Sequence, residues 1–359
     1  MIQNIIDQKI IERLRVLING VQHIAITCHK SPDGDALGST LALCHVLRKL
    51  GKDAVVVTPD MVPKALTFIP GLRDLVVYTQ DPNRATAAMK KAQLLFCLDF
   101  NSLQRIDRLA DVVEPLNIKR VLIDHHLKPD DSFDLAISFP EASSTCELVF
   151  RVLMQMDMLR YLDQQAASCL YVGLVTDTGG FAYSCDNPDF YKILANIVKR
   201  GINRRMLFDN AMNNFSADSL RLQGYAISEK MELYPEQEVA LIVLTQDELK
   251  RFNYNRGDTE TLVNKPLAIP NIRWSVFLRE DTDKIKVSCR SKGHFSVSDI
   301  CERYFNGGGH ENAAGGDFTG TMDEAIATFH QVLADIYPGS KSAVQDAEPV
   351  QQLTTETDN

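Results

Sequence analysis

The sequence lacks the features of a membrane or exported protein. No apolar run approaches the roughly 18 residues that would cross a bilayer, which excludes an integral membrane protein. The N-terminal stretch mixes acidic, basic and apolar side chains, unlike the uninterrupted apolar core of a signal peptide. We therefore expect a cytoplasmic protein with no membrane partner.

The sequence also lacks CxxC pairs. Its eight cysteines are widely spaced, and several lie inside apolar runs. This pattern predicts buried free thiols in a reducing compartment. It argues against a zinc–thiolate site and against a disulfide framework.

Positive charge is in short supply. The chain has 38 Lys and Arg residues against 47 Asp and Glu residues, a formal net charge of −9. Sequence-independent binding of long nucleic acid relies on a broad basic surface, so we expect no long nucleic acid as a partner. A small phosphorylated substrate stays open, because a local cluster or a bound metal can reverse the sign of the field.

The first half of the chain alternates strand-like runs with helical patterns. The strand-like runs are residues 22–28, 53–57, 94–99 and 120–124. Such alternation predicts an α/β fold, with a mostly parallel sheet flanked by helices in a domain over residues 1–187. The total of 359 residues is enough for a second domain.

The second half changes character at about residue 188. A charged helical stretch over 188–232 is interpreted as a connector. Strand-like runs then return, followed by a glycine-rich loop at 306–316 and a last helix near 322–336. We predict a smaller α/β domain with a mixed sheet over 233–338 and a polar, disordered tail over 339–359.

Acidic and histidine residues follow the strand-like runs of the first half. Because the carboxyl ends of parallel strands share one edge of a sheet, residues that follow such strands are expected to converge there. A further aspartate ends the helical pattern that starts near residue 163. The candidates are His29, Asp33 and Asp35; Asp99; Asp124, His125 and His126; and Asp177.

Each of these positions has an ordinary structural explanation. An aspartate after a strand is often a helix cap or a loop former, and a backbone carbonyl can satisfy a histidine. The joint occurrence favours a metal centre, because several buried carboxylates at one edge would repel one another without cations. Four aspartates carry four negative charges, which two divalent ions balance, and carboxylate–imidazole ligation without thiolate suits Mn²⁺, Mg²⁺, Co²⁺ or Zn²⁺. Two such ions can promote phosphoester cleavage.

Six segments resemble the motifs of one family. HKSPDGDALGS, LLFCLDFNS, VLIDHH and GLVTDTGGF resemble the four motifs of the DHH phosphoesterase superfamily, in order and at ordinary spacing. CRSKGHFSVSDI and GGGHENAAGG resemble its DHH-associated C-terminal domain. The resemblance covers about residues 20–320 and is strongest to the compact two-domain, NrnA-like type, which acts on nano-RNA and on pAp.

The resemblance implies a role for each candidate in a centre of two Mn²⁺ ions, with Mg²⁺ or Co²⁺ as alternatives. His29 and Asp33 would hold one ion, and Asp35, His125 and Asp177 would hold the other. Asp99 would bridge both ions, and a water or hydroxide between them would attack phosphorus. His126 would contact the scissile phosphate and either stabilise the developing charge or protonate the leaving oxygen. Asp124 would fix the orientation of the neighbouring histidine or of its loop.

The resemblance also assigns substrate-binding residues to the wall of an interdomain cleft. A guanidinium can grip a phosphate, and a glycine-rich backbone can form an anion nest. The ordinary alternatives are a surface ion pair and a tight turn. These candidates are Arg290, Ser291, Gly307, Gly308, Gly309 and His310, with Arg105 as a further phosphate contact of the first domain. Phe181 and Tyr183 are better explained as core residues than as base-stacking residues.

The function that follows is Mn²⁺-dependent hydrolysis of short RNA or DNA oligonucleotides of two to five nucleotides, and of pAp. The same motifs fit a cyclic-di-AMP or pApA phosphodiesterase, so this alternative stays open. A RecJ-like single-strand exonuclease is a further alternative, but such enzymes carry an extra oligonucleotide-binding domain. Related proteins often pair, so a homodimer is also compatible with the sequence.

Overall fold

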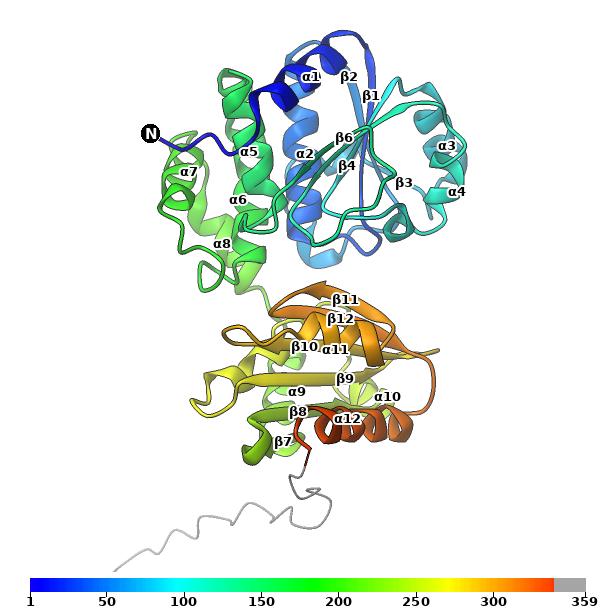
Figure 1. Cartoon of the computed structure of the whole chain (residues 1–359), viewed down its shortest axis with the longest axis vertical. Helices are drawn as coiled ribbons and strands as arrows, with labels where there is room; N and C mark the ends of the chain where they lie inside the picture. Colours follow the sequence, from blue (N-terminus) through cyan, green and yellow to red (C-terminus); the bar gives the residue numbers. More distant parts are fainter. Residues whose placement is uncertain (339–359) are drawn as a thin grey trace, which may run out of the picture. The chain divides into compact units, whose positions relative to one another are not determined.

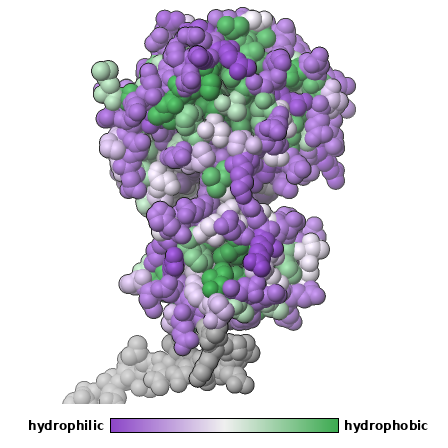
Figure 2. Space-filling view, in the orientation of Figure 1, coloured by the Kyte–Doolittle hydropathy of each residue, from purple (hydrophilic) through white to green (hydrophobic). Residues whose placement is uncertain are grey.

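A computed structural model describes residues 1–338 of the chain. These residues form two compact units that divide between Asn214 and Phe215, inside the stretch assigned above to a connector. No helix in this described part is both long and apolar enough to span a membrane. On the face shown in Figure 2, hydrophilic residues dominate both units, and apolar residues occur in small groups. The tail predicted over 339–359 lies outside the described residues.

The N-terminal unit is built on a six-stranded sheet in which every pair of neighbouring strands is parallel (Figure 1). The strand order is β3-β2-β1-β4-β5-β6. The strands are β1 (His23–Cys28), β2 (Asp53–Thr58), β3 (Val76–Val77), β4 (Leu94–Leu98), β5 (Lys119–Asp124) and β6 (Leu135–Ser138). The strand order reverses between β1 and β4. Open α/β sheets bind ligands at such a topological switch point, outside the carboxyl ends of the strands.

Helices cover both faces of this sheet, so its central strands are apolar on both sides. On one face pack α1 (Gln8–Asn19), α2 (Gly34–Lys49) and α5 (Thr145–Gln155), with α6 (Gln164–Asp177), α7 (Pro188–Val198) and α8 (Arg204–Met212) beside them. On the other pack α3 (Pro82–Lys91) and α4 (Leu109–Val113). This architecture confirms the predicted α/β fold. All eight cysteines are free and buried, which confirms the predicted burial.

Helices α2 and α6 approach each other closely because small residues line their contact. A Cβ atom on Gly38 would lie 2.5 Å from the carbonyl oxygen of Cys169, so any larger residue would push the helices apart. A Cβ atom on Gly173 would overlap the Cys146 sulfur and lie 2.7 Å from Asp35 Oδ1. The glycines therefore let α2, α5 and α6 meet at the end of the sheet where the acidic residues collect.

The C-terminal unit contains the predicted mixed sheet, with the order β11-β12-β10-β9-β8-β7. Only β8 and β9 are parallel neighbours within it. The strands are β7 (Met231–Tyr234), β8 (Val239–Leu244), β9 (Trp274–Glu280), β10 (Ile285–Ser291), β11 (Gly307–His310) and β12 (Ala313–Phe318). Helices α11 (Val297–Tyr304) and α12 (Met322–Ile336) pack on one face, and α9 (Ala217–Glu229) and α10 (Gln246–Arg251) on the other.

The prediction of a glycine-rich loop over residues 306–316 is wrong. This segment forms the hairpin of β11 and β12, in which Gly307 pairs with Gly316 and His310 with Ala313. The glycines permit close backbone approach, since a Cβ on Gly307 would overlap the carbonyl oxygen of Gly315. The packing of the strands therefore requires glycine here. Hydrogen bonds between β11 and β12 also use some of the backbone N–H groups that an anion nest would need.

Candidate metal centre

The side chains predicted as metal ligands come together at the carboxyl edge of the parallel sheet. His29 follows β1, Asp99 follows β4, and His125 follows β5. Asp35 lies in the first turn of α2, and Asp177 is the last residue of α6. Residues that are up to 148 positions apart in sequence thus share one site, because parallel strands deliver their ends to the same edge.

Three of these residues form a first ligand group, His29, Asp33 and Asp99. His29 Nε2 lies 3.7 Å from Asp33 Oδ2 and 3.4 Å from Asp99 Oδ2. The longer distance exceeds that of a normal hydrogen bond, and the shorter is at its upper limit. Two ligands that each lie about 2.0–2.2 Å from a shared ion are separated by about 3–4 Å, so this spacing fits a bound cation.

A second ligand group consists of Asp35, His125 and Asp177. His125 Nε2 lies 3.4 Å from Asp177 Oδ2 and 3.8 Å from Asp35 Oδ2. It also lies 3.6 Å from Asp99 Oδ1. Asp99 therefore turns one carboxylate oxygen to each ligand group.

Both histidines are oriented in the way that metal-binding imidazoles usually are. His29 Nδ1 lies 2.8 Å from the carbonyl oxygen of Lys30, and His125 Nδ1 lies 3.2 Å from that of Ala142. A carbonyl can only accept, so each Nδ1 carries the hydrogen. This tautomer directs the Nε2 lone pair of each neutral ring toward the carboxylates.

The site contains buried carboxylates close to one another, an arrangement that added positive charge stabilises. Asp35 and Asp99 are only 1% and 2% exposed. Burial, together with the charges of Asp99 and Asp177, raises the pKa of Asp35 well above its ordinary value. Burial lowers the pKa of His29, but the neighbouring Asp33 and Asp99 outweigh it and raise that pKa well above its ordinary value. These residues, all hard oxygen or imidazole donors, fit a divalent cation centre.

Asp33 combines the two roles that the sequence left as alternatives. Its Oδ1 accepts hydrogen bonds of 3.0 Å from the backbone N–H groups of Asp35 and Ala36 and so caps α2. Its Oδ2 faces His29. The cap fixes the carboxylate, so the structural role supports the proposed ligand role.

Asp99 has a backbone conformation that suggests a functional constraint. Its φ of +65° lies in the left-handed region, which is unfavourable for residues other than glycine, although aspartate tolerates it better than most. Its N–H donates to the carbonyl oxygen of Ile123 at 3.2 Å. Such strain persists where the surroundings require it, often at a functional site.

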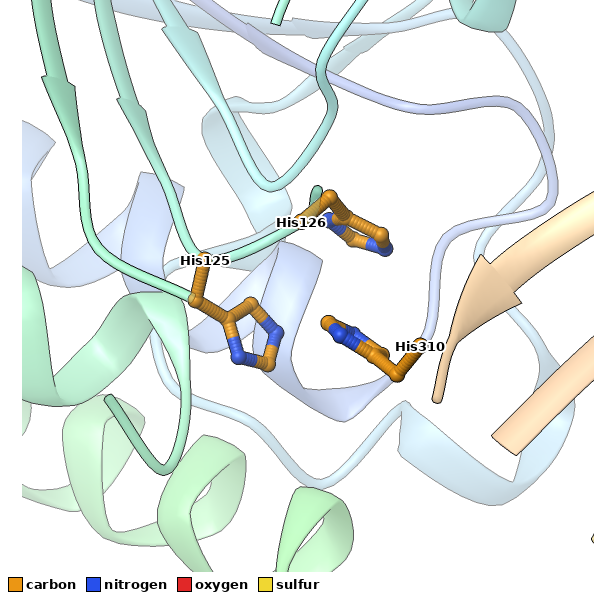
Figure 3. A group of neighbouring side chains, drawn as sticks. All are labelled: His125, His126 and His310. Carbon is orange, nitrogen blue, oxygen red and sulfur yellow. The ribbon is translucent and has the colours of Figure 1, made fainter. Parts of the chain in front are cut away.

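His126 differs from its neighbour His125. Figure 3 shows the two rings leaving successive residues of the loop after β5, and they meet edge to face with centroids 5.2 Å apart. His126 Nδ1 donates to Asp124 Oδ1 at 2.7 Å, and Asp124 is fully buried. The carboxylate fixes the orientation and the tautomer of the ring.

The start of α5 contacts two of the predicted ligands, which the sequence does not indicate. Asp35 accepts from the N–H groups of Thr145 at 2.6 Å and Cys146 at 2.9 Å. Thr145 Oγ1 donates to Asp99 Oδ1 at 3.0 Å. The capping pattern of Ser144 and Glu147 predicts where this helix begins, but no local signal indicates which distant carboxylates it meets.

The predicted substrate residues lie in both units. Arg105 belongs to the 3₁₀ turn Leu103–Ile106, and its carbonyl oxygen accepts from Lys30 N at 2.7 Å, beside the loop that carries His29. It forms no ion pair within residues 1–338, so the alternative of a salt bridge is not supported. Phe181 packs edge to face on Tyr171 and Phe190, as predicted for a core residue. Tyr183 is 50% exposed, so its prediction as a core residue is wrong.

In the C-terminal unit, Arg290 and His310 both pair with Ala313 of β12, from opposite sides. Residues directly opposite in a sheet point to the same face, so these two side chains form a row about 10 Å long. Gly308 lies on that face too, while Gly307 and Gly309 alternate to the other. Ser291 is not part of the row, and in this it departs from the expectation: it is buried, its hydroxyl donates to Phe295 O at 2.6 Å and accepts from Asn312 Nδ2 at 2.8 Å.

The fold and the site together define a hydrolase of phosphoester bonds with a candidate divalent-metal centre. Residues 23–174 match the N-terminal domain of the DHH family, and residues 238–335 match the DHHA1 domain. The chain belongs to the DHH family, and its C-terminal unit contains the DHHA1 domain.

Two curated relatives are similar over most of this chain. The bifunctional oligoribonuclease and PAP phosphatase NrnA of Bacillus subtilis is 28% identical over 309 residues, covering 86% of this chain and 91% of that protein. The cyclic-di-AMP phosphodiesterase GdpP of Geobacillus thermodenitrificans is 26% identical over 355 residues, covering 91% of this chain but 50% of GdpP.

Solved structures share the fold. The crystal structure of an exopolyphosphatase-related protein from Bacteroides fragilis is 41% identical, with a TM-score of 0.88, and the match covers 93% of this chain and 98% of that one. RecJ from Thermus thermophilus in complex with Mn²⁺ is 13% identical with a TM-score of 0.53, covering 91% of this chain and 54% of RecJ, so it shares the fold alone.

Proposed function

We propose that this protein is a Mn²⁺-dependent phosphoesterase that hydrolyses oligonucleotides of two to five nucleotides and removes a phosphate from pAp. The observation that carries the proposal is the pair of ligand groups joined by the two oxygens of Asp99. A relative of nearly equal length that is named oligoribonuclease and PAP phosphatase supports the choice of substrate.

Under this proposal each ligand group holds one ion. His29 and Asp33 would hold the first ion, Asp35, His125 and Asp177 the second, and Asp99 both. When bound, two divalent ions supply a strong nucleophile from water at neutral pH and compensate the charge of the phosphoryl oxygens. The carboxylates would hold the ions in place, and the burial of Asp35 and Asp99, which are 1% and 2% exposed, would limit the access of bulk water to them.

In this proposal His126 acts on the scissile phosphate, and Asp124 orients its ring. Asp124 accepts the Nδ1 hydrogen of His126 at 2.7 Å and is fully buried, so the ring cannot turn without losing that bond. With its orientation fixed in this way, His126 would act on the scissile phosphate through Nε2, either by stabilising the developing charge or by protonating the departing oxygen.

Residues of each unit are proposed to bind the substrate. Arg105 would contact a phosphate close to the loop that carries His29. Arg290, Gly308 and His310, which share one face of the second sheet, would bind the rest of the nucleotide. Guanidinium groups suit this task because they form two parallel hydrogen bonds to phosphate.

A second candidate is hydrolysis of cyclic-di-AMP or its linear product pApA. The match to GdpP, which spans 91% of this chain, favours it. That protein is about twice as long as the matched region, whereas the NrnA match spans nearly the whole relative, so short oligonucleotides and pAp remain the first choice.

The test is a side-by-side measurement of initial rates with Mn²⁺. The substrates are pAp, pApA, cyclic-di-AMP, RNAs of two to five nucleotides, and inorganic polyphosphate. We expect the highest kcat/KM on the dinucleotides and on pAp. Faster cleavage of cyclic-di-AMP or of polyphosphate would overturn the substrate assignment, and no turnover of any substrate with Mn²⁺ bound would overturn the proposal itself.

A further inference from the structure

We propose that the segment Ala142–Cys146, which ends in the first turn of α5, is a positioning element for the second ligand group and for the Asp99 oxygen that faces it. Thr145 is the most important residue of this segment, because it contacts two predicted ligands. Its N–H donates to Asp35, and its hydroxyl donates to Asp99. The inference rests on the proposed function, since it assumes that the two ligand groups bind metal. It goes further by making the two metal sites unequal.

The segment contacts three predicted ligands of the second ion. Ala142 O accepts from His125 Nδ1 at 3.2 Å and so fixes the tautomer of that ring. The N–H groups of Thr145 and Cys146 donate to opposite oxygens of Asp35, at 2.6 and 2.9 Å. Thr145 Oγ1 donates to Asp99 Oδ1 at 3.0 Å.

The contact to Asp99 is selective between its two oxygens. Oδ1, which Thr145 contacts, is the oxygen that lies 3.6 Å from His125 Nε2. Oδ2, which lies 3.4 Å from His29 Nε2, receives no hydrogen bond from the segment. A hydrogen bond to one lone pair of Oδ1 directs the other lone pair of that same oxygen toward the second ligand group.

The first ligand group is supported by other parts of the chain. The backbone at the start of α2 fixes Asp33, and Lys30 O fixes the His29 ring. The loop between them is held by Asp60, whose carboxylate accepts from Ser31 N at 2.8 Å. The two ligand groups therefore share Asp99 but have separate supports.

A buried ion pair holds the segment in place. Arg151 Nε donates to Glu147 Oε1 at 2.7 Å, and Glu147 Oε2 accepts from Ser143 N at 2.9 Å and from Ser143 Oγ at 2.7 Å. Both charged side chains are at most 5% exposed. Groups that are buried and hydrogen-bonded in this way have little freedom to move, which suits an element that must hold ligands at fixed distances.

The experiment compares Mn²⁺ binding to the metal-free full-length protein and to Thr145→Val, which keeps the shape of the side chain and removes the hydroxyl. Binding is followed by electron paramagnetic resonance of free Mn²⁺ and by calorimetry, with no substrate present. We expect the wild type to bind two ions. In Thr145→Val, one ion should bind about 10–100-fold more weakly, the cost typical of losing a group that orients a metal ligand, while the other stays within about two-fold.

Two further variants separate positioning from general destabilisation. Thr145→Ser keeps the hydroxyl and should restore both affinities. Thr40→Val removes another fully buried hydroxyl, which bonds to the carbonyl oxygen of Ala36 at 2.7 Å and contacts no predicted ligand, so it should leave Mn²⁺ binding unchanged. If Thr145→Val does not fold, Thr145→Ala replaces it in the same titration.

The outcomes distinguish this inference from the proposed function. Unchanged binding in Thr145→Val, or an equal loss at both sites, overturns the inference while the metal centre stands. A wild type that binds no Mn²⁺ overturns both. Selective loss of one ion, with rescue by serine, supports the inference.

Discussion

Two six-stranded sheets in one chain place their polar side chains in different ways. In the N-terminal sheet all strands are parallel, and the residues of interest follow strands β1, β4 and β5 at a single edge. In the C-terminal sheet most neighbours are antiparallel, and Arg290 and His310 form a row across three strands on one face. The first arrangement buries several charges around one point, and the second spreads donors over a half-exposed surface.

The difference matches the demands of two kinds of chemistry. A metal centre needs many ligands within a few ångströms, and the common edge of a parallel sheet supplies them from distant parts of the chain. Recognition of an extended phosphorylated molecule needs fewer, separated contacts, which a sheet face supplies at about 4.8 Å per strand. Three substitutions and a change of pH test this division.

The largest effect is expected from Asp99→Asn, because an amide cannot replace a carboxylate shared by both ligand groups. We expect kcat/KM on pAp to fall by at least about 10³-fold and both Mn²⁺ ions to bind weakly, since the metal supplies several kcal/mol of transition-state stabilisation. Steady-state rates and Mn²⁺ titration measure this. Asp111→Asn, at an exposed position in α4, is the matched control, and a variant that keeps two ions and a normal rate contradicts the assignment.

Gly173→Ala should affect both stability and metal binding. The new Cβ would overlap the Cys146 sulfur and lie 2.7 Å from Asp35 Oδ1. Relief of this overlap requires a shift of α6 or of its neighbours α2 and α5, and such a shift displaces the Asp35 carboxylate relative to the other ligands. We expect a loss of about 1–3 kcal/mol in the free energy of unfolding, measured in urea, and at least about 10-fold weaker binding of one Mn²⁺.

The control for this change comes from the second sheet. A Cβ on Gly308 would find no atom closer than 3.6 Å, so Gly308→Ala should change the free energy of unfolding by no more than about 0.5 kcal/mol. Equal effects of the two substitutions would show that the crowding at Gly173 is not what holds Asp35.

Arg290→Ala should act on substrate and leave the metal alone. Loss of a charge-assisted hydrogen bond of about 1.5–3 kcal/mol predicts a rise in KM of about 10-fold or more. Mn²⁺ content, measured by atomic emission, should stay at the wild-type value. A large fall in Mn²⁺ content would mean that Arg290 supports the centre and does not bind substrate.

The smallest expected effect is the pH dependence of stability without metal. The pKa of Asp35 is raised by burial and by neighbouring carboxylates, so folding favours its protonated form and stability falls as the pH rises above about 3.8. The pKa of His29 is raised because Asp33 and Asp99 outweigh burial, and its contribution is present below about 6.5 and is lost as the pH rises through the raised value. In EDTA we therefore expect the free energy of unfolding to decrease from about pH 6.5 to pH 8. Below that range His45, whose pKa is lowered by burial, contributes the opposite slope.

Added Mn²⁺ should reverse this slope, because the ligands bind metal in their deprotonated forms. Urea unfolding at several pH values, with EDTA or with Mn²⁺, measures both slopes. If the free energy of unfolding rises with pH in EDTA, then Asp35 and His29 do not lie in a buried, negatively charged site that is stabilised by added positive charge.

Much of the N-terminal unit was predictable from local sequence. Buried parallel strands have almost continuous apolar runs, as in LLFCL of β4, and helices that follow them begin at capping residues such as Asp33. The convergence of His29, Asp99 and His125 follows from the parallel arrangement alone, since strand ends meet at one edge whatever the loops do. The proposed roles of these residues remain predictions.

The C-terminal unit was less predictable because glycine has several uses. Residues 306–316 suggest a loop by composition, but the hairpin of β11 and β12 uses the missing side chains for close packing against Phe305 and Gly315. Strand register decides to which face of the sheet the Ser291 side chain points. Adjacent residues of a strand point to opposite faces, so Arg290 lies on the half-exposed face and Ser291 on the buried one. Composition does not encode register.

The sequence by itself determined the fold class. It also determined which strands are followed by aspartate or histidine, and hence the set of oxygen and imidazole donors. These depend on hydrophobic period and residue type, which are local properties. Only the tertiary structure decided which carboxylate oxygen faces which histidine, that α5 begins against Asp35 and Asp99, and that glycines at the contact of α2 and α6 make room for this. Such relations are set by packing between residues far apart in the chain, and a change of one ångström there alters which atoms can meet.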